Sequence, residues 1–417
     1  MSRNIFYAQS GGVTPVINAT ACGVIETARK NQHRIGKVYA GLNGIVGALE
    51  NNIIDTTLES DADIAKLRYT PAGAFGSCRH KLPDPNQDMV PYNKLFETFK
   101  RHNIEYFFYN GGGDSQDTTH KISEIAKKLG YPLKCIGLPK TIDNDLPITD
   151  NCPGFGSVAK YVAVSIKEAA LDIASMAKTS TKFFVMEVMG RHTGWIAAAS
   201  GLSSLNSNGL SSAAPHIILF PEVPFDQDKF LAKTKECTEK FGYCVVVVSE
   251  GLKDKSGNLI QKQAATDSFG HAQLGGIAPY IANMVTSNLG YKNHWAVCDY
   301  LQRAARHIAS KTDVEQAYAL GEQAVLQALD NKTDIMLTIE RVSSNPYKWQ
   351  IDQAPLASVA NIEKDMPKDF FSDDGFHISQ KCVDYLLPLI QGEDYPKYNQ
   401  FGLPDYVKLK NILVDKK

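Results

Sequence analysis

Short apolar runs alternate with amphipathic stretches along much of this chain. The runs are bounded by glycine or polar residues, and a run this short favours a strand over a helix. They predict strands at Ile5–Ala8, Tyr106–Tyr109, Cys135–Leu138, Phe183–Met189, His216–Phe220 and Cys244–Ser249.

The stretches between the runs have helical periodicity. Apolar residues recur at helical spacing in three places: Ile17, Ala21, Val24 and Ala28; Ile122, Ile125, Ala126 and Leu129; and Val314, Ala317, Ala324 and Ala328 within Thr312–Leu329. Strands alternating with helices predict an α/β fold, with parallel sheets covered by helices on both faces. In such folds ligands bind beyond the carboxyl ends of the strands, beside helix N-termini.

Composition narrows the class of protein. With 417 residues, the chain suggests two or three domains or one large two-lobed enzyme. A hydrophobic content of 43% and a net charge of −1 exclude disorder as the main state. The same charge argues against a nucleic-acid binder with a basic surface.

The cysteines and the apolar runs indicate the compartment. The 8 cysteines are scattered without a CxxC pair, so we expect free thiols in a reducing cytosol and no zinc site. The N-terminal stretch is too polar for a signal peptide, and no apolar run reaches the ~20 residues that span a bilayer. We therefore expect a soluble, cytoplasmic protein without membrane contact.

Glycines follow the first two predicted strands. Gly11 and Gly12 come after the first, where glycine lets backbone N–H groups approach a phosphate, although a tight turn without a ligand explains them equally. Gly111, Gly112 and Gly113 follow the second, and Asp114 then opens a helix. A helix N-terminus favours anions and the carboxylate suits Mg²⁺, while a simple helix cap is the alternative.

A second acidic cluster follows the third strand. In Pro139-Lys140-Thr141-Ile142-Asp143-Asn144-Asp145, one aspartate can accept a proton from an attacking hydroxyl and another can organise Mg²⁺. The lysine can neutralise charge on a transferring group, although an ordinary polar loop is the alternative.

A strand also ends at Met186-Glu187-Val188-Met189-Gly190-Arg191-His192-Thr193-Gly194-Trp195, where the arginine suits an anion clamp or is a plain surface residue. Gly154–Ala159 matches GxGxxA but follows no predicted strand, which disfavours a dinucleotide site. No GxxxxGK[ST] sequence is present.

These motifs, in this order, resemble the phosphofructokinases along essentially the whole chain, and most closely the pyrophosphate-dependent branch. The matching segments are Ser10–Gly12, Gly111–Ser115, Pro139–Asp145, Met186–Trp195, Ser249–Gly251 and Tyr300–Arg303. The resemblance implies two Rossmann-like lobes, one of 1–150 with about 304–340 and one of about 151–303 with about 341–417, and an active site in the cleft between them.

The resemblance also implies residue roles. Asp143 would be the base that takes the proton from the sugar 1-hydroxyl, with Lys140, Thr141 and Arg191 as further catalytic residues. The remaining roles fall into three sets: a donor site of Gly11, Gly12, Arg79, Gly111–Asp114 and Lys140; a fructose 6-phosphate site of Thr141, Asp143, Met189, Gly190, Arg191, Glu250, Tyr300 and Arg303; and Mg²⁺ ligands Asp114 and Asp145.

The identity of the donor follows from two positions. Relatives that use ATP usually have glycine where this chain has Asp114 and Lys140. A carboxylate at 114 repels and crowds the α-phosphate of a nucleotide, and like charges brought together can cost several kcal/mol. The lysine ammonium can instead reach a pyrophosphate oxygen.

Three departures from the family pattern bear on the site. Gly113 stands where most relatives have an acid that helps to bind Mg²⁺. Lys182 and His294 align with arginines that bind the sugar phosphate from a neighbouring subunit, so we expect a homodimer or homotetramer with shared active sites.

The leading interpretation is reversible phosphoryl transfer from pyrophosphate to C1 of fructose 6-phosphate. The alternatives are an ATP-dependent 6-phosphofructokinase and, of another class, a non-catalytic sugar-phosphate-binding regulatory subunit, which Gly113 favours. Retention of Lys140, Asp143 and Arg191 argues against the second alternative.

Overall fold

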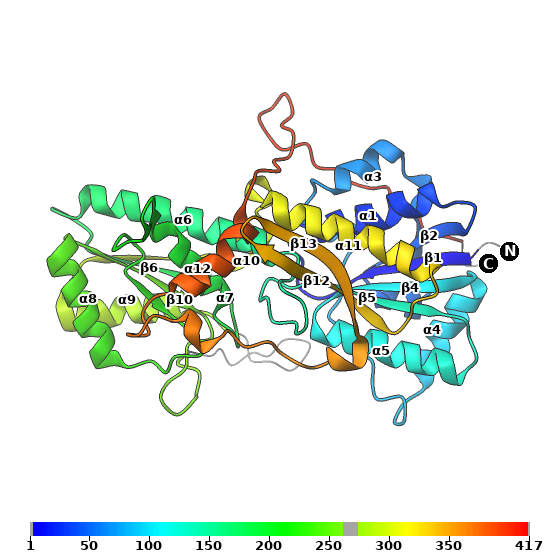
Figure 1. The fold of residues 1–417 in the computed structure, drawn as a ribbon, viewed down its shortest axis with the longest axis horizontal. Coiled ribbons are helices and arrows are strands. Elements are labelled where there is room, and N and C mark those ends of the chain that lie inside the picture. Colours follow the sequence, from blue (N-terminus) through cyan, green and yellow to red (C-terminus); the bar gives the residue numbers. More distant parts are fainter. Residues whose placement is uncertain (1–2, 262–273, 416–417) are drawn as a thin grey trace. The chain divides into compact units, whose positions relative to one another are not determined.

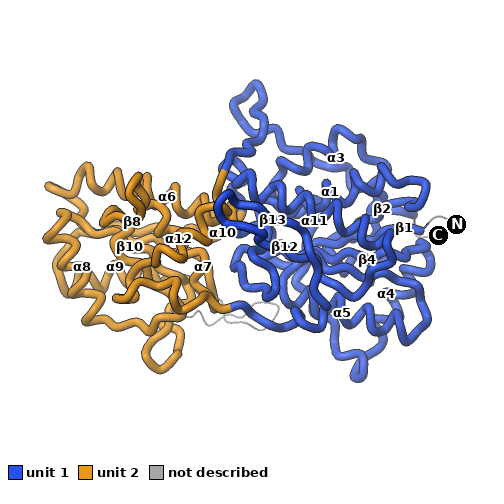
Figure 2. Tube along the Cα trace, in the orientation of Figure 1, with its two compact units in different colours: residues 1–155, 304–364, 392–417 blue, residues 156–303, 365–391 orange. Residues whose placement is uncertain are grey.

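The structure is a computed structural model and describes residues 3–261 and 274–415. The chain divides into two compact units (Figure 2). Unit 1 comprises Met1–Phe155, Ala304–Lys364 and Gly392–Lys417, and unit 2 comprises Gly156–Arg303 and Asp365–Gln391.

Unit 1 is built on a seven-stranded sheet (Figure 1). In spatial order its strands are β13 (Tyr347–Pro355), β12 (Ile335–Ser344), β5 (Lys134–Pro139), β4 (Ile104–Gly111), β1 (Arg3–Gln9), β2 (Ile35–Gly41) and β3 (Ile53–Asp55). Strands β12, β5, β4, β1 and β2 run parallel, and β13 and β3 pair antiparallel at the two edges.

Helices cover both faces of this sheet, because its central strands are apolar on both sides. Ile5 and Tyr7 of β1 lie in one buried cluster with side chains of α1 (Ile17–Lys30), α3 (Asp61–Leu67) and α11 (Lys311–Leu329). Phe6 and Ala8 lie in the other, with α2 (Ile45–Leu49), α4 (Val90–Arg101) and α5 (Gly113–Lys128). Figure 1 shows α1 and α11 on one side of the sheet and α4 and α5 on the other.

Two glycines let α1 and α11 approach closely. A Cβ on Gly23 would lie 2.2 Å from the carbonyl oxygen of Tyr318, and one on Gly321 would lie 2.1 Å from that of Thr20. Any larger residue at either position would force the helices apart.

Unit 2 has a four-stranded parallel sheet, in the order β11 (Asn293–Val297), β6 (Phe183–Val188), β10 (Cys244–Ser249) and β9 (Ile217–Leu219). Strand β10 is buried along its whole length, as its run of four valines predicts. The other elements of the unit are α6 (Phe155–Met176), α7 (Trp195–Ala199), α8 (Gln227–Phe241), α9 (Ile277–Leu289), α10 (Asp299–Ala304), α12 (Gln380–Leu386) and a small hairpin of β7 (Leu205–Asn206) and β8 (Gly209–Leu210).

Local signals fix the ends of α8. The Asp226 carboxylate accepts a hydrogen bond from the Lys229 N–H at the helix start, and Gly242, with φ +85°, ends the helix in the left-handed region. The helix then packs Phe230 and Cys237 against the β9 and β10 side chains.

The α/β class predicted from the sequence is confirmed, and every strand predicted there lies in or overlaps an observed strand. Two expectations differ from the structure. Leu129 lies beyond the end of α5 and is exposed. The segment of about 341–417, assigned to the second lobe from the resemblance, is divided between the units: residues 365–391 lie in unit 2, whereas β13 belongs to the unit 1 sheet and residues 392–417 belong to unit 1.

Candidate active site

In unit 1, the predicted donor residues lie on three loops that leave neighbouring strands. Gly11 and Gly12 follow β1, Gly112 and Asp114 follow β4, and Lys140 follows β5. The strands are adjacent in the order β5-β4-β1, and parallel neighbours end at the same edge of the sheet. The structure therefore brings these residues to one edge, as the sequence predicted.

The turn after β1 faces a buried lysine. Gly11 has φ +72°, and its N–H donates to the carbonyl oxygen of Cys78 at 2.9 Å. The Ser77 hydroxyl donates to the Gly11 carbonyl oxygen at 2.8 Å. A Cβ on Gly11 would lie 3.3 Å from Lys140 Nζ, so the ammonium lies against the turn. The backbone turn and the ammonium thus lie side by side, and this combination suits a phosphate.

The loop after β4 leads directly into α5, and its glycines place no side chain in front of the helix N-terminus. Gly111 admits no Cβ, which would lie 2.1 Å from Ser115 Oγ, and that hydroxyl donates to Ser10 Oγ at 2.8 Å. A Cβ on Gly113 would meet no atom within 4 Å. Open space before the N–H groups of a helix start favours an anion.

The loop after β5 holds the predicted base. The Lys140 N–H donates to the Gly111 carbonyl oxygen at 3.2 Å, which joins this loop to the glycine loop. The Asp143 N–H donates to Thr141 Oγ1 at 3.0 Å. Asn144, at φ +55°, accepts from the Cys152 N–H at 2.9 Å. These bonds set the backbone on both sides of the Asp143 carboxylate.

Asp145 lies in an unfavourable place for a lone carboxylate. Burial, and next the charge of Glu363, raise the pKa of Asp145. The Lys364 N–H donates to the Asp145 carbonyl oxygen at 2.6 Å, and Lys364 Nζ donates to the carbonyl oxygens of Thr149 and Asp150 at 3.1 and 3.0 Å. The loop is therefore held by a segment more than two hundred residues further along the chain.

The segment Cys78–Lys81 lies beside the Gly11 turn, because Ser10 and Cys78 form an isolated parallel bridge. Arg79 follows directly and is exposed. Two residues later, Lys81 Nζ lies 2.9 Å from Asp114 Oδ1. Lys81 is not among the residues predicted from the sequence, and only its closeness to Arg79 along the chain signals it.

In unit 2, the predicted sugar-phosphate residues lie after β6 and β10, which are neighbours. The Gly190 N–H lies 3.4 Å from Glu250 Oε1, and the Ser249 hydroxyl donates to the Gly190 carbonyl oxygen at 2.6 Å. Gly190 has φ +136°, and Gly251 admits no Cβ because the Arg191 carbonyl oxygen would lie 2.1 Å away. Burial raises the pKa of Glu250, and its bond from Gly190 and the charge of Arg191 oppose the rise.

Tyr300 and Arg303 lie on α10, after β11. The Arg303 guanidinium lies over the Tyr300 ring, 3.7 Å from its centre. Between them, the fully buried Gln302 accepts from the Met189 N–H at 3.4 Å and donates to the Asp299 carbonyl oxygen at 2.9 Å. Gln302 therefore links this helix to the loop after β6, and it is not among the residues predicted from the sequence.

Lys182 and His294 lie at the other end of the unit 2 sheet. Lys182 precedes β6, and His294 pairs with Phe184 near the start of that strand. At about 3.3 Å per residue along a strand, both lie far from Arg191 at the carboxyl end. Within one chain, the structure does not bring them to the other predicted sugar-phosphate residues.

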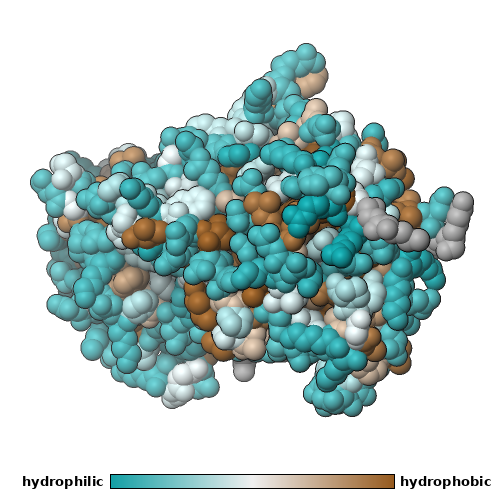
Figure 3. Space-filling view, turned by 45° about the vertical axis from the view of Figure 1, so that its right-hand side comes forward, coloured by the Kyte–Doolittle hydropathy of each residue, from teal (hydrophilic) through white to brown (hydrophobic). Residues whose placement is uncertain are grey.

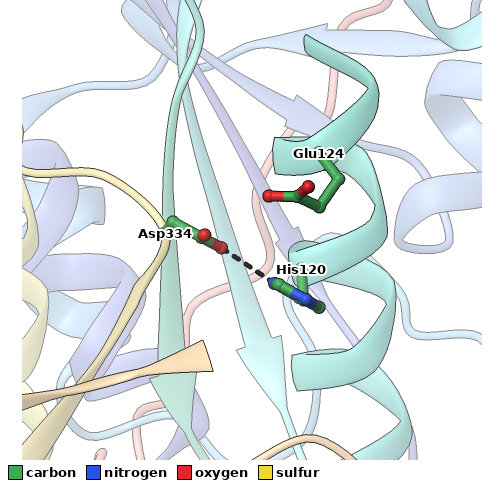
Figure 4. Close-up of side chains that lie close together, drawn as sticks. All are labelled: His120, Glu124 and Asp334. Carbon is green, nitrogen blue, oxygen red and sulfur yellow. Dashed lines mark hydrogen bonds and ion pairs between the residues drawn. The ribbon is translucent and has the colours of Figure 1, made fainter. Parts of the chain in front are cut away.

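In the part of the chain that the structure describes, neither Asp114 nor Asp145 belongs to a cluster of three metal-ligand side chains. His120, Glu124 and Asp334 do form such a group, with atoms within 4.8 Å of one another (Figure 4). Lys127 Nζ bonds to Glu124 Oε1 at 2.8 Å and Asp334 Oδ2 at 2.9 Å. That ammonium pairs with both carboxylates and offsets one of their two charges, so these side chains form an ion-pair network.

The face of the molecule drawn in Figure 3 is mostly hydrophilic, with hydrophobic residues in small groups. Among the helices of the described residues, none has the length and apolar character that crossing a bilayer requires.

Comparisons with known proteins identify the family of this chain. The family model described as phosphofructokinase matches residues 4–326. The chain belongs to the phosphofructokinase family. Two relatives named pyrophosphate–fructose 6-phosphate 1-phosphotransferase, from Halomonas elongata and Methylococcus capsulatus, are 58% and 59% identical, and each match covers 100% of this chain and 98% of the relative.

A solved phosphofructokinase has the same fold. The crystal structure of a pyrophosphate-dependent phosphofructokinase from Nitrosospira multiformis is 58% identical, with a TM-score of 0.91, and the match covers 100% of this chain and 99% of that one. The resemblance seen in the sequence, and the phosphofructokinase fold that it implied, are therefore confirmed.

Proposed function

We propose that this chain transfers a phosphoryl group reversibly from pyrophosphate to the 1-hydroxyl of fructose 6-phosphate, giving fructose 1,6-bisphosphate and phosphate. The observation that carries the proposal is the buried Lys140 ammonium against the Gly11 turn, on the loop next to Asp114. A fixed cation beside backbone N–H groups suits a small anion of high charge. The names of the relatives, at 58% and 59% identity along the chain, support the same donor.

Asp143 acts as the general base in this proposal. Its carboxylate takes the proton from the sugar 1-hydroxyl as that oxygen attacks the nearer phosphorus of pyrophosphate. The bond from that phosphorus to the bridging oxygen breaks, and phosphate leaves. The bond from Asp143 to Thr141 supports this role, because it fixes the loop that carries the base.

Lys140 stabilises the charge that develops on the transferring group and the leaving phosphate. A cation held in place before the reaction needs no reorganisation, and such electrostatic stabilisation is commonly the largest single contribution to catalysis. Gly12, Gly112 and Gly113 supply N–H groups to the donor. The Gly11 turn supplies open space only, because its own N–H donates to the Cys78 carbonyl oxygen. The exposed Arg79 supplies a second cation.

Mg²⁺ is the cofactor we infer, with Asp145 as its best-placed ligand. Mg²⁺ prefers oxygen ligands and usually takes one or two carboxylates together with substrate phosphates. A carboxylate whose charge is opposed by burial and by Glu363 fits a site where a cation is part of the bound state. Asp114, the other ligand predicted from the sequence, has Lys81 as its ion-pair partner. When bound, Mg²⁺ neutralises charge on the phosphate oxygens.

Unit 2 supplies the sugar-phosphate residues of the proposal. Arg191 and Arg303 give cations to the phosphate, and Met189, Gly190, Glu250 and Tyr300 surround the sugar. Lys182 and His294 serve the site of a neighbouring copy, since both lie at the opposite end of the sheet from Arg191. We therefore propose a homodimer or homotetramer with shared sites.

A coupled assay of fructose 1,6-bisphosphate formation tests the function. The purified chain receives fructose 6-phosphate, Mg²⁺ and pyrophosphate, and Asp143→Asn is measured beside it. The proposal predicts turnover by the unsubstituted chain and a loss of kcat of about 100-fold or more in the variant, the range of general-base catalysis. Absence of turnover in the unsubstituted chain would contradict the proposal.

A further inference from the structure

The Asp114 carboxylate presents an electrostatic problem for the proposed function, on which this inference rests. Asp114 lies in the first turn of α5, where the helix dipole stabilises its negative charge. The same charge lies beside the loops assigned to an anionic donor, and like charges brought together weaken binding. A carboxylate that rejects a nucleotide would therefore also repel pyrophosphate unless its charge were offset.

The structure contains a group that offsets it. Lys81 Nζ lies 2.9 Å from Asp114 Oδ1. The two residues come from different parts of unit 1, Lys81 from the segment after α3 and Asp114 from the start of α5. The Asp114 side chain is 34% exposed, so the pair lies at the surface of the site where a ligand can approach it.

We propose that Lys81 is a specificity-determining residue for the donor, whose ammonium neutralises Asp114 so that this carboxylate excludes a nucleotide by its size without repelling pyrophosphate by its charge. Lys81 is a positioning residue in this proposal, because it acts through Asp114. Its partner Asp114 is the acidic residue in the first turn of α5.

The segment that carries Lys81 is fixed relative to the donor loops. Cys78 bridges to Ser10, the Ser77 hydroxyl donates to the Gly11 carbonyl oxygen at 2.8 Å, and Leu82 is buried directly after Lys81. The backbone of Lys81 is therefore fixed by contacts of the residues before and after it.

A purely structural role of the Lys81–Asp114 pair would show in the melting temperature and not in the KM for pyrophosphate. Exposed Lys–Asp pairs contribute little to the free energy of unfolding, so Lys81→Gln should leave the melting temperature nearly unchanged. The chain offers a matched control in Lys66, on α3, whose Nζ lies 2.8 Å from Asp405 Oδ2 and which is about half exposed like Lys81. Loss of either ion pair should lower the melting temperature by a similar small amount, and only loss of the Lys81 pair should change the KM for pyrophosphate.

The test is a double-mutant cycle read as KM and kcat for pyrophosphate, with saturating fructose 6-phosphate and Mg²⁺. Lys81→Gln should raise the KM for pyrophosphate about tenfold, the effect of one uncompensated charge near the donor. In the Asp114→Asn background the same substitution should change it less than about threefold, because no charge is left to offset. Lys81→Arg should keep the KM of the unsubstituted chain, and Lys66→Gln should leave it unchanged.

The possible results separate the two proposals. Turnover of the unsubstituted chain with an unchanged KM in Lys81→Gln would overturn the inference and leave the proposed function intact. An equal rise of KM in both backgrounds would also overturn it, because Lys81 would then bind pyrophosphate directly and independently of Asp114. An unsubstituted chain without pyrophosphate turnover would overturn the proposed function and this inference with it.

Discussion

Lys140 Nζ lies against the turn at Gly11, at 3.3 Å from the place where a Cβ on that glycine would stand. The two residues follow β5 and β1, and between these strands lies β4, whose own loop carries Asp114. One cation, one backbone turn and one helix N-terminus are thus held by three adjacent strands. This relationship is the structural basis of the proposed donor site.

Gly11→Ala tests whether the turn must stay open. The φ of +72° costs a residue with a Cβ about 1–2 kcal/mol, and the new methyl group would press on Lys140 Nζ. We expect a rise of at least about tenfold in the KM for pyrophosphate, the effect of about 1.4 kcal/mol.

The matched control for Gly11→Ala is Gly130→Ala. Gly130 has φ +61° and no atom within 4 Å of a new Cβ, so it suffers the same backbone strain away from the donor loops. Melting temperatures should fall in both variants, whereas the KM for pyrophosphate should change only at Gly11. Equal KM values for Gly11→Ala and the unsubstituted chain would mean that the donor does not use this turn.

Asp114→Gly tests the nucleotide barrier. Removal of the side chain relieves the crowding of an α-phosphate, so kcat/KM with ATP should rise by at least about tenfold. The same substitution should not improve kcat/KM with pyrophosphate. A variant that gains no ATP turnover would place the barrier elsewhere in the donor site.

Asp145→Asn should separate stability from activity. The native carboxyl has a raised pKa, so it holds its proton more tightly than in the unfolded chain, and native stability falls as the pH rises through the interval between the two pKa values. The amide has no charge to bury. The ligand-free variant should therefore melt higher than the unsubstituted chain at a pH above the native pKa, and the difference should shrink as the pH falls through the interval between the two pKa values.

The kcat of Asp145→Asn should fall at least about tenfold, the usual cost of a lost metal-site group. Asp150→Asn, on the same loop, should change the melting temperature in the opposite direction. The Asp150 carboxylate accepts from Arg341 Nε at 3.0 Å, and loss of this partly buried pair should lower the melting temperature. A stabilised Asp145→Asn with full activity would remove Asp145 from the metal site.

Lys182→Ala tests the shared site. Within the described residues, Lys182 Nζ donates one long hydrogen bond, at 3.3 Å, to the Ala177 carbonyl oxygen, so its loss should cost little stability. We expect the KM for fructose 6-phosphate to rise about tenfold, the loss of one phosphate contact by a cation, with the oligomer intact by light scattering. Lys178→Ala is the control. An unchanged KM in an intact oligomer would refute the shared site.

The sequence predicted those features that depend on local pattern. The apolar runs located β1, β4, β5, β6 and β10, and the residues that end these strands are the ones brought to the sheet edges. Parallel topology explains this success, since ligand loops follow the strands directly.

Features that depend on contacts between distant segments were not predicted. The bridge between Ile54 and Leu413 holds the end of the chain to the edge strand β3, and no local periodicity encodes it. Lys364 donates three hydrogen bonds to the loop at Asp145–Asp150, and Gln302 accepts one from Met189; both loops are far away in the sequence. Lys81 was missed for the same reason, because its partner Asp114 lies thirty-three residues further on.

The most direct test of the central claim is the ratio of kcat/KM for pyrophosphate to kcat/KM for ATP, measured on one preparation with fructose 6-phosphate and Mg²⁺. The claim that Lys140 and Asp114 select pyrophosphate predicts a ratio of at least about 100, two tenfold steps of binding. A ratio below one would contradict it and make ATP the donor.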